Sequence, residues 1–267
     1  MNFLRNLVLP LTANDRAQRL ISNAAESLQA LAGIGMVADP AQSGERALVD
    51  LLAAKEGPLI VFDVGANVGG FSSLVLDRLE GRTLSLHCFE PGKTAFAKLR
   101  EKLRGCADVH LNNCALGAAC GQRQLYFYHE GSSLASLTRR RLDHFRGGSR
   151  PEDALEETVD VTTLDDYLAR RGLDRIDLLK IDVEGHEMDV LNGAANALRD
   201  GKIRFLTFEF GGCNIDTRTY FRDFWYFFRN FPGASIFRLT PSGFLHRIAK
   251  YRESHEIFRA ANYLVTF

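Results

Sequence analysis

Short apolar runs alternate with amphipathic segments between residues 58 and 210, and this alternation restricts the fold more than any other feature of the chain. The run at residues 59–62, Leu-Ile-Val-Phe, is apolar throughout, as in a strand that is buried on both faces. Further strands are expected at residues 83–90, 109–114, 176–182 and 203–210. Helices are expected at residues 70–79, 94–103 and 187–198. The alternation therefore predicts an α/β fold of the Rossmann-like type, with helices on both faces of a mostly parallel sheet.

Four short segments outside this alternation also have strand character. Residues 124–128 and 158–161 are expected to pair with each other as an extra antiparallel element. Residues 235–239 and 263–267 are largely apolar and are interpreted as two closing strands of the main sheet.

Two segments near these strands allow more than one interpretation. The polar stretch at residues 130–157 contains three consecutive arginines at 139–141, so it is either a lid that binds a phosphorylated acceptor or a solvated loop. The aromatic run at residues 220–228 could form a dimer face or a surface that stacks on sugars. We expect it to be a helix that packs on the sheet, because its apolar residues recur at helical spacing.

Residues 1–57 are expected to form a helical N-terminal extension, and residues 58–267 the α/β domain. Apolar residues recur at steps of three and four between positions 20 and 31, and residues 47–55 continue the pattern. The extension could be an arm that forms a lid or an oligomer contact. A pair of helices that packs on the core is the more common arrangement, and we expect it here.

Composition excludes some classes of protein. Lys plus Arg and Asp plus Glu number 33 each, so no net charge favours nucleic acid as a partner. No apolar run approaches the roughly 20 residues that a membrane span needs. The five cysteines form no Cys-x-x-Cys pair, which favours reduced thiols and a cytoplasmic protein. The composition is compatible with a homo-oligomer.

The first motif, Asp-Val-Gly-Ala-Asn-Val-Gly at residues 63–69, follows the first predicted strand. A glycine-rich turn lets the backbone approach a ligand closely. In a Gly-x-Gly-x-x-Gly dinucleotide fingerprint, Asn67 would be a glycine, and Asp63 would repel a pyrophosphate. A ligand with an ammonium and a carboxylate but no phosphate fits better, and S-adenosylmethionine is such a ligand. Asp63, Gly65, Asn67 and Gly69 are therefore candidate cofactor-binding residues.

The second motif is Phe-Glu-Pro at residues 89–91, at the end of the second predicted strand. An acidic residue there, 21 positions after Gly69, is placed to accept hydrogen bonds from ribose hydroxyls, and we assign this role to Glu90. Asn113 and Cys114 end the third strand, where the adenine edge is expected. The alternative for Glu90 is a carboxylate that caps the following helix.

The third motif ends the fourth predicted strand with several titratable side chains. Strand alternation places Lys180, Asp182 and Glu184 on one side, with His186 just beyond. Titratable groups at this edge of the sheet are candidates for a general base or for metal ligands, and Asp182 is also close enough to be a cofactor contact. The alternative is that the acidic residues only cap the next helix.

Four motifs in this order resemble the FkbM family of methyltransferases. They are residues 63–69, residues 89–91, residues 163–167 (Thr-Leu-Asp-Asp-Tyr) and residues 180–187 (Lys-Ile-Asp-Val-Glu-Gly-His-Glu). The resemblance covers about residues 58–267 and implies a class I methyltransferase fold and S-adenosylmethionine as methyl donor. It also implies a hydroxyl acceptor on a sugar, a glycan or a natural product. It matches Asp182, Glu184 and His186 to the family's signature on the fourth strand.

The sequence allows two mechanisms of methyl transfer and two other functions. Asp182 or His186 could accept the proton of the hydroxyl. Alternatively, a divalent cation held by Asp182, Glu184 and Glu209 could acidify it. The chain could also be a non-catalytic nucleotide-binding module or another Rossmann-like oxidoreductase. The missing dinucleotide fingerprint and the presence of Asp63 count against the oxidoreductase.

Overall fold

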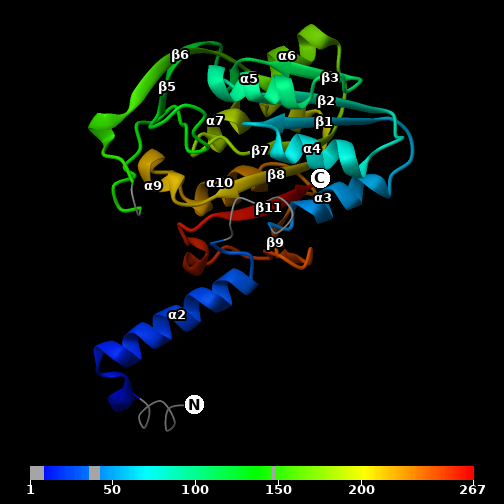
Figure 1. Cartoon of the computed structure of the whole chain (residues 1–267). Helices are drawn as coiled ribbons and strands as arrows, with labels where there is room; N and C mark the ends of the chain where they lie inside the picture. Colours follow the sequence, from blue (N-terminus) through cyan, green and yellow to red (C-terminus); the bar gives the residue numbers. More distant parts are fainter. Residues whose placement is uncertain (1–8, 36–42, 146–147) are drawn as a thin grey trace.

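The computed structural model describes residues 9–35, 43–145 and 148–267, and within them eight strands form one main sheet (Figure 1). In sheet order these are β10 (Leu245–Arg247), β9 (Ser235–Leu239), β11 (Ala261–Thr266), β8 (Ile203–Phe210), β7 (Ile176–Ile181), β1 (Leu59–Val64), β2 (Leu84–Phe89) and β3 (Val109–Asn112). The strands from β8 to β3 are parallel, and β11 runs antiparallel to both of its neighbours. The predicted strands are therefore present, and β10 is an additional short edge strand.

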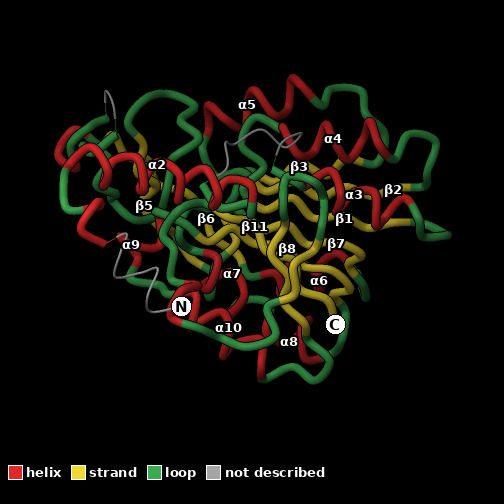
Figure 2. Tube along the Cα trace, turned by 90° about the horizontal axis from the view of Figure 1, so that it is seen from below, coloured by secondary structure: helices red, strands yellow, loops and turns green. Residues whose placement is uncertain are grey.

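Helices cover both faces of this sheet, as the alternation of apolar runs predicts (Figure 2). One hydrophobic cluster joins the sheet to α3 (Glu45–Ala53), α4 (Gly70–Arg78) and α5 (Lys93–Lys102). The other joins it to α6 (Leu164–Arg171), α7 (Glu187–Asn192), α8 (Ala195–Arg199) and α10 (Phe221–Arg229). The helix expected at residues 187–198 is divided at Gly193, where a Cβ would lie 2.0 Å from the carbonyl oxygen of Gly117. The aromatic run at residues 220–228 packs on the sheet, as expected, because Phe221, Phe224 and Phe228 of α10 are buried.

A second, three-stranded sheet lies beside the main one. Its order is β4 (Ala115–Leu116), β6 (Leu155–Thr162) and β5 (Gly121–Phe127), and β5 pairs antiparallel with β6. Gln124 lies opposite Thr158, which confirms the expected pairing of residues 124–128 with 158–161. The long connection between β5 and β6 crosses the carboxyl ends of the main strands.

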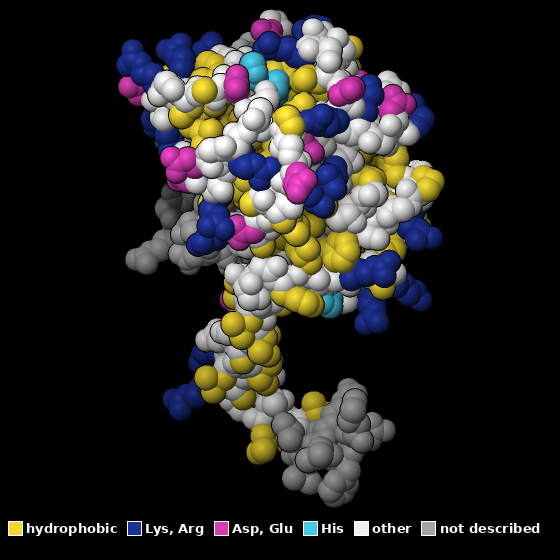
Figure 3. Space-filling model, turned by 90° about the vertical axis from the view of Figure 1, so that its right-hand side faces the viewer, with side chains coloured by type: hydrophobic (Ala, Val, Ile, Leu, Met, Phe, Trp, Pro, Cys, Tyr) yellow, Lys and Arg dark blue, Asp and Glu magenta, His cyan; other side chains and the backbone are white. Residues whose placement is uncertain are grey.

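The N-terminal extension contains one helix that packs on the core and one that does not. In α3, Leu48, Val49 and Leu52 are almost fully buried against α4 and the sheet. In contrast, α2 (Asp15–Leu31) has no buried residue and leads away from the body, with an apolar stripe in solvent (Figures 1 and 3). The expectation of two packed helices is therefore wrong for α2: its apolar residues do recur at helical spacing, but none of the described residues covers its apolar stripe.

The base of α2 is fixed to the body by the residues that directly precede β11. The Arg259 side chain donates a hydrogen bond of 2.7 Å to Gln29, and the Gly35 amide donates one of 2.8 Å to the carbonyl oxygen of Ala260. Residues 1–8 and 36–42 of the predicted extension lie outside the described residues. Among the helices that are described, none is long and apolar enough to cross a membrane.

Candidate active site

The turn after β1 needs a glycine because the backbone of the neighbouring strand lies directly against it. Gly65 has φ +83°, and a Cβ at this position would lie 1.8 Å from the carbonyl oxygen of Asp182. No side chain fits at that distance without moving one of the two strands. Asn67 also has a positive φ of 49°, and Gly69, at φ +80°, precedes α4. The predicted turn therefore forms where β1 and β7 end side by side.

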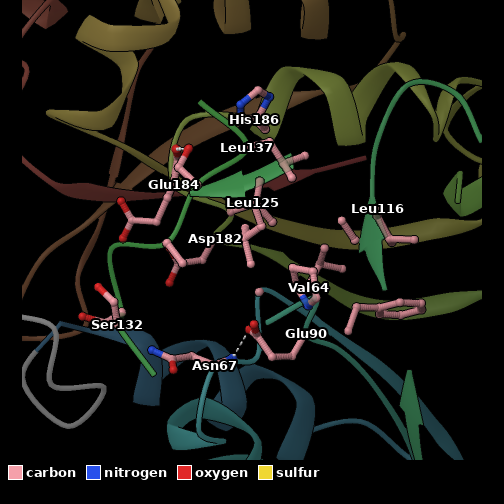
Figure 4. A pocket seen from close by; sticks show the side chains of 18 residues that line it. Val64, Asn67, Glu90, Leu116, Leu125, Ser132, Leu137, Asp182, Glu184 and His186 are labelled. Carbon is pink, nitrogen blue, oxygen red and sulfur yellow. Dashed lines mark hydrogen bonds between the residues drawn. The ribbon is translucent and has the colours of Figure 1, made fainter. Parts of the chain in front are cut away.

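A narrow cavity opens beside this turn (Figure 4). Its floor comes from the ends of β1, β2 and β7, and the segment at residues 132–137 covers it. Figure 4 shows Asn67 and Glu90 at one end, His186 at the other and Asp182 between them. Gly65 and Glu184 also line the cavity, so the three sequence motifs meet at one place.

Glu90 is oriented by two backbone amides. Its carboxylate accepts hydrogen bonds from the amide of Asn67 at 2.9 Å and from the amide of Gly92 at 2.8 Å. Burial raises the pKa of Glu90 to about 7. The side chain is only 7 % exposed yet lines the cavity, so any ligand there meets a carboxylate whose position is fixed.

Asn113 and Cys114 do not line the narrow cavity, although they were expected at the adenine edge. The side-chain amide of Asn113 donates hydrogen bonds of 2.9 Å to the carbonyl oxygens of Glu90 and Pro91, so it supports the turn behind Glu90. Cys114 packs against the hydrophobic core. Ala115 and Leu116, the next two residues, line the cavity instead.

A wide cleft of about 2430 Å³, open to solvent, continues from the narrow cavity past Asp182. At its base lies Lys180, whose Nζ atom is 2.9 Å from Asp182, 3.8 Å from Asp63 and 4.0 Å from Glu45. Burial alone would lower the pKa of Lys180, but these three carboxylates raise it above its usual value. Asp63 is fully buried and accepts a hydrogen bond of 2.6 Å from Ser72.

Glu45 is a site residue that the sequence analysis missed. It begins α3, in the N-terminal extension, and reaches the cleft because α3 packs against α4. Ser43 donates a hydrogen bond of 2.7 Å to its carboxylate. No local motif marks Glu45, which lies two residues before the stretch at residues 47–55 that was predicted to be helical.

Glu184 is bound to the segment that covers the cavity. Its carboxylate pairs with the buried guanidinium of Arg140, which lies 3.5 Å from Asp216 on its other side. The Ser136 hydroxyl donates a hydrogen bond of 2.8 Å to the carbonyl oxygen of Glu184. Burial raises the pKa of Glu184, and the ion pair with Arg140 opposes this shift. Glu184 thus anchors the covering segment.

The arginines at residues 139–141 are all engaged within the protein. Arg139 lies 3.6 Å from Glu156, Arg140 pairs with Glu184, and Arg141 bonds Asp143. Residues 132–137 of the segment at residues 130–157 cover the narrow cavity, and Arg140, Arg141, His144 and Phe145 line the wide cleft. Its three consecutive guanidinium groups already have carboxylate partners. Residues 146–147 of this segment lie outside the described residues.

His186 and Glu209 line different parts of the site, the narrow cavity and the wide cleft respectively. Both ring nitrogens of His186 are engaged, Nδ1 with Asp189 at 2.7 Å and Nε2 with Thr138 at 3.0 Å. Glu209, at the end of β8, lines the wide cleft as expected. Burial raises the pKa of Glu209 well above its usual range, and neighbouring carboxylates add to this effect. Across the described ranges, no three His, Cys, Asp or Glu side chains are arranged to hold a metal ion.

Comparison with protein families connects this geometry to a known group of proteins. The model of the methyltransferase FkbM domain matches residues 63–231, more than half of the chain. The chain belongs to the FkbM methyltransferase family. Its Rossmann-like sheet, with β11 inserted antiparallel between β8 and β9, is the class I methyltransferase fold, to which a helical N-terminal segment is added.

Two curated relatives of this chain are O-methyltransferases by name. The 31-O-demethyl-FK506 methyltransferase FkbM of Streptomyces tacrolimicus is 34% identical over 158 residues, which are 52% of this chain and 60% of that protein. The 2-O-methyltransferase NoeI of Sinorhizobium fredii (strain NBRC 101917 / NGR234) is 29% identical over 175 residues, 62% of this chain and 68% of that protein. The chain thus spans about two thirds or less of the length of these relatives.

The crystal structure of methyltransferase FkbM from Methylobacillus flagellatus KT is similar to this chain at a TM-score of 0.48 and 17% identity. The similarity covers 79% of this chain and 45% of that one.

Proposed function

We propose that the chain transfers a methyl group from S-adenosylmethionine to a hydroxyl oxygen of a small-molecule or glycan acceptor. The observation that carries this proposal is the fixed carboxylate of Glu90 beside the glycine turn of residues 65–69. The names of two relatives, which specify methyl transfer to oxygen, support the choice of acceptor atom. The five cysteines, none of which forms a disulfide, support a cytoplasmic location.

The residues of the narrow cavity and of the adjoining wide cleft fit this cofactor. Asp63 Oδ1 and Asn67 Oδ1 are buried and accept no hydrogen bond from the described residues, so both can receive N–H or O–H donors from a ligand. Glu90 would hold the ribose hydroxyls, and the bare backbone at Gly65 leaves room for close approach. When bound, S-adenosylmethionine supplies a methyl group bonded to a sulfonium sulfur. The sulfur departs as a neutral thioether, which is a good leaving group.

Asp182 is the better placed of the two residues considered as the base. It lines both the narrow cavity and the wide cleft, whereas His186 lines only the narrow cavity and has both nitrogens engaged. Lys180 holds Oδ2 of Asp182 at 2.9 Å and so orients the carboxylate. In this proposal Asp182 accepts the proton of the hydroxyl, a role that typically contributes on the order of 10²–10⁴ in rate.

The remaining site residues would position the reactants and exclude water. Arg140 and Ser136 tie the covering segment to Glu184, which closes the narrow cavity over one end of the site. Alignment of this kind can lower a barrier by up to about 7–11 kcal/mol in well-oriented systems.

Calorimetric titration with S-adenosylhomocysteine tests the proposal, with NAD as the competing ligand and Glu90→Gln as the control variant. We expect saturable binding of S-adenosylhomocysteine alone, and weaker binding in the variant. A preference for NAD would indicate an oxidoreductase instead. Binding of neither compound would contradict the proposed cofactor. Tight binding without any methyl transfer to alcohols would favour the non-catalytic module.

A further inference from the structure

The strand register aligns three polar residues across the base of the wide cleft. Asp182 follows Ile181, which pairs with Phe208, so Asp182 at the end of β7 is level with Glu209 on β8. Glu209 is in turn opposite Asn262 on β11. Because Thr207 pairs with Lys180, and side chains alternate along a strand, Glu209 and Asp182 project from the same face of the sheet.

Acidic side chains outnumber basic ones at this base. Glu45, Asp63, Asp182 and Glu209 line the wide cleft and are here called the acidic floor. Lys180 contacts the first three carboxylates but carries only one charge.

Other cations that line the cleft have partners outside the acidic floor. Arg140 pairs with Glu184, Arg141 bonds Asp143, and Arg259 lies 3.9 Å from Glu26.

Two carboxylates of the acidic floor are incompletely paired. Asp63 is fully buried and accepts a hydrogen bond from Ser72 through Oδ2, but its Oδ1 atom accepts none and has the Nζ atom of Lys180 3.8 Å away. Within the described part of the chain, the Glu209 carboxylate has neither a hydrogen bond nor an ion pair. Burial raises the pKa of Glu209 well above its usual range, and the nearby carboxylates of Asp182, Glu184 and Glu187 raise it further. A cationic ligand would relieve this surplus of negative charge.

We propose that the acidic floor makes the site distinguish the methyl donor from its spent product by charge, and that Glu209 is the main determinant of this preference. The inference rests on the proposed function. S-adenosylmethionine and S-adenosylhomocysteine share the adenosine, the ammonium and the carboxylate, and differ in the sulfur, which is a sulfonium in the first and neutral in the second. An excess of carboxylates therefore favours the donor and aids release of the product.

The test measures binding by calorimetry for three compounds: S-adenosylmethionine, S-adenosylhomocysteine and sinefungin, in which a carbon bearing a cationic amine replaces the methylated sulfur. We expect the wild-type chain to bind both charged compounds on the order of tenfold more tightly than S-adenosylhomocysteine. Glu209→Gln should remove most of this ratio while it leaves the affinity for S-adenosylhomocysteine within about twofold. Glu56→Gln, an exposed carboxylate, serves as the matched control.

A second variant tests the same idea by adding charge. Asn262→Asp places another carboxylate beside Glu209 and should increase the preference for the charged compounds. An unchanged ratio in both variants, or in Asn262→Asp alone where Glu209→Gln does not fold, would overturn the inference. So would equal affinities of the wild-type chain for all three compounds. If none of the three binds, it is the proposed function that fails.

Discussion

The narrow cavity and the wide cleft share a boundary at Asp182 but are built differently. In the narrow cavity, Glu90 is held by two backbone amides, and the covering segment is tied to Glu184 through Ser136 and Arg140. In the wide cleft, Glu209 has no partner among the described residues, and the other three carboxylates of the acidic floor share one lysine. The first space is preorganised by hydrogen bonds, whereas the second is defined by its charge.

This difference indicates how each space selects a ligand. Fixed hydrogen-bond partners discriminate by shape and by the position of polar atoms, because an unmatched buried group costs free energy. An excess of charge discriminates by the ligand's own charge and tolerates variation in its shape. Mutations in the narrow cavity should therefore weaken every adenosine compound alike. Mutations in the wide cleft should have effects that depend on the charge of the ligand.

The largest effect is expected at the boundary, from Gly65→Ala. The added Cβ would lie 1.8 Å from the carbonyl oxygen of Asp182, so β1 and β7 must separate. We expect a loss of about 3 kcal/mol or more in the free energy of unfolding, together with loss of S-adenosylhomocysteine binding. Denaturant unfolding and calorimetry measure the two effects.

Gly81→Ala is the matched control for this change. Gly81 has a similar φ of +77° but no atom within 4 Å of the added Cβ, so it should lose only about 1–2 kcal/mol. Equal losses at the two positions would show that backbone strain, and not the contact between β1 and β7, sets the need for glycine.

The next effect is expected from Glu90→Gln in the narrow cavity. The amide can replace only one of the two acceptor oxygens, so one backbone N–H loses its partner. We expect the affinity for S-adenosylmethionine and for S-adenosylhomocysteine to fall by a similar factor, about 10- to 100-fold. A loss confined to one of the two compounds would contradict the division between cavity and cleft.

The same variant has a signature in the pH dependence of stability. The pKa of Glu90 in the fold is about 7, above the value of 4.5 for an unperturbed glutamate. Because a raised pKa favours the protonated form in the folded state, the contribution of Glu90 is present below pH 4.5 and is lost as the pH rises through 7. The wild-type free energy of unfolding, relative to that of Glu90→Gln, should fall by up to about 3 kcal/mol across this window. A flat difference would show that Glu90 is not desolvated.

A smaller effect, and one that depends on ligand charge, is expected from Glu45→Gln. This change removes one carboxylate 4.0 Å from Lys180. We expect about a threefold loss of affinity for S-adenosylmethionine and sinefungin and no change for S-adenosylhomocysteine. Competition binding at low and high salt measures it, with Glu56→Gln as the control. A uniform loss for all three compounds would mean that Glu45 acts on the shape of the site.

The smallest effect is expected from Cys114→Ala. The side chain packs on the core and does not line the narrow cavity, so the affinity for S-adenosylhomocysteine should change by less than about twofold. A tenfold loss would return Cys114 to the cofactor site, where the sequence analysis expected it.

Local patterns sufficed to predict most of the fold. Buried parallel strands are recognisable because both of their faces are apolar, as in residues 59–62, and helices keep their own period. The same helical period gave a wrong prediction of packing for α2. Amphipathicity shows that a helix has an apolar face, but it does not show what covers that face. The break in α7–α8 depends on contact between Gly193 and Gly117, which are distant in sequence.

The residues of the site also differ in whether local patterns could predict them. Gly65, Asn67, Glu90 and Asp182 meet at one cavity, as their motifs predicted, because strand ends are close to one another in any parallel sheet. Glu45 could not be predicted, since it reaches Lys180 only through the packing of α3 on α4. Asn113 was misplaced by two to three residues, which is enough to exchange a contact with the ligand for support of a turn.

The position of β11 has a consequence for how the chain assembles. This strand follows every other strand in sequence, yet it lies inside the sheet, between β8 and β9. Until it joins, β8 and β9 each keep an unpaired edge, and an open edge can recruit strands from other molecules. Because such distant pairing closes a long loop, it is slow. Completion of the wide cleft, to which β11 contributes Asn262, therefore coincides with the pairing of these two open strand edges.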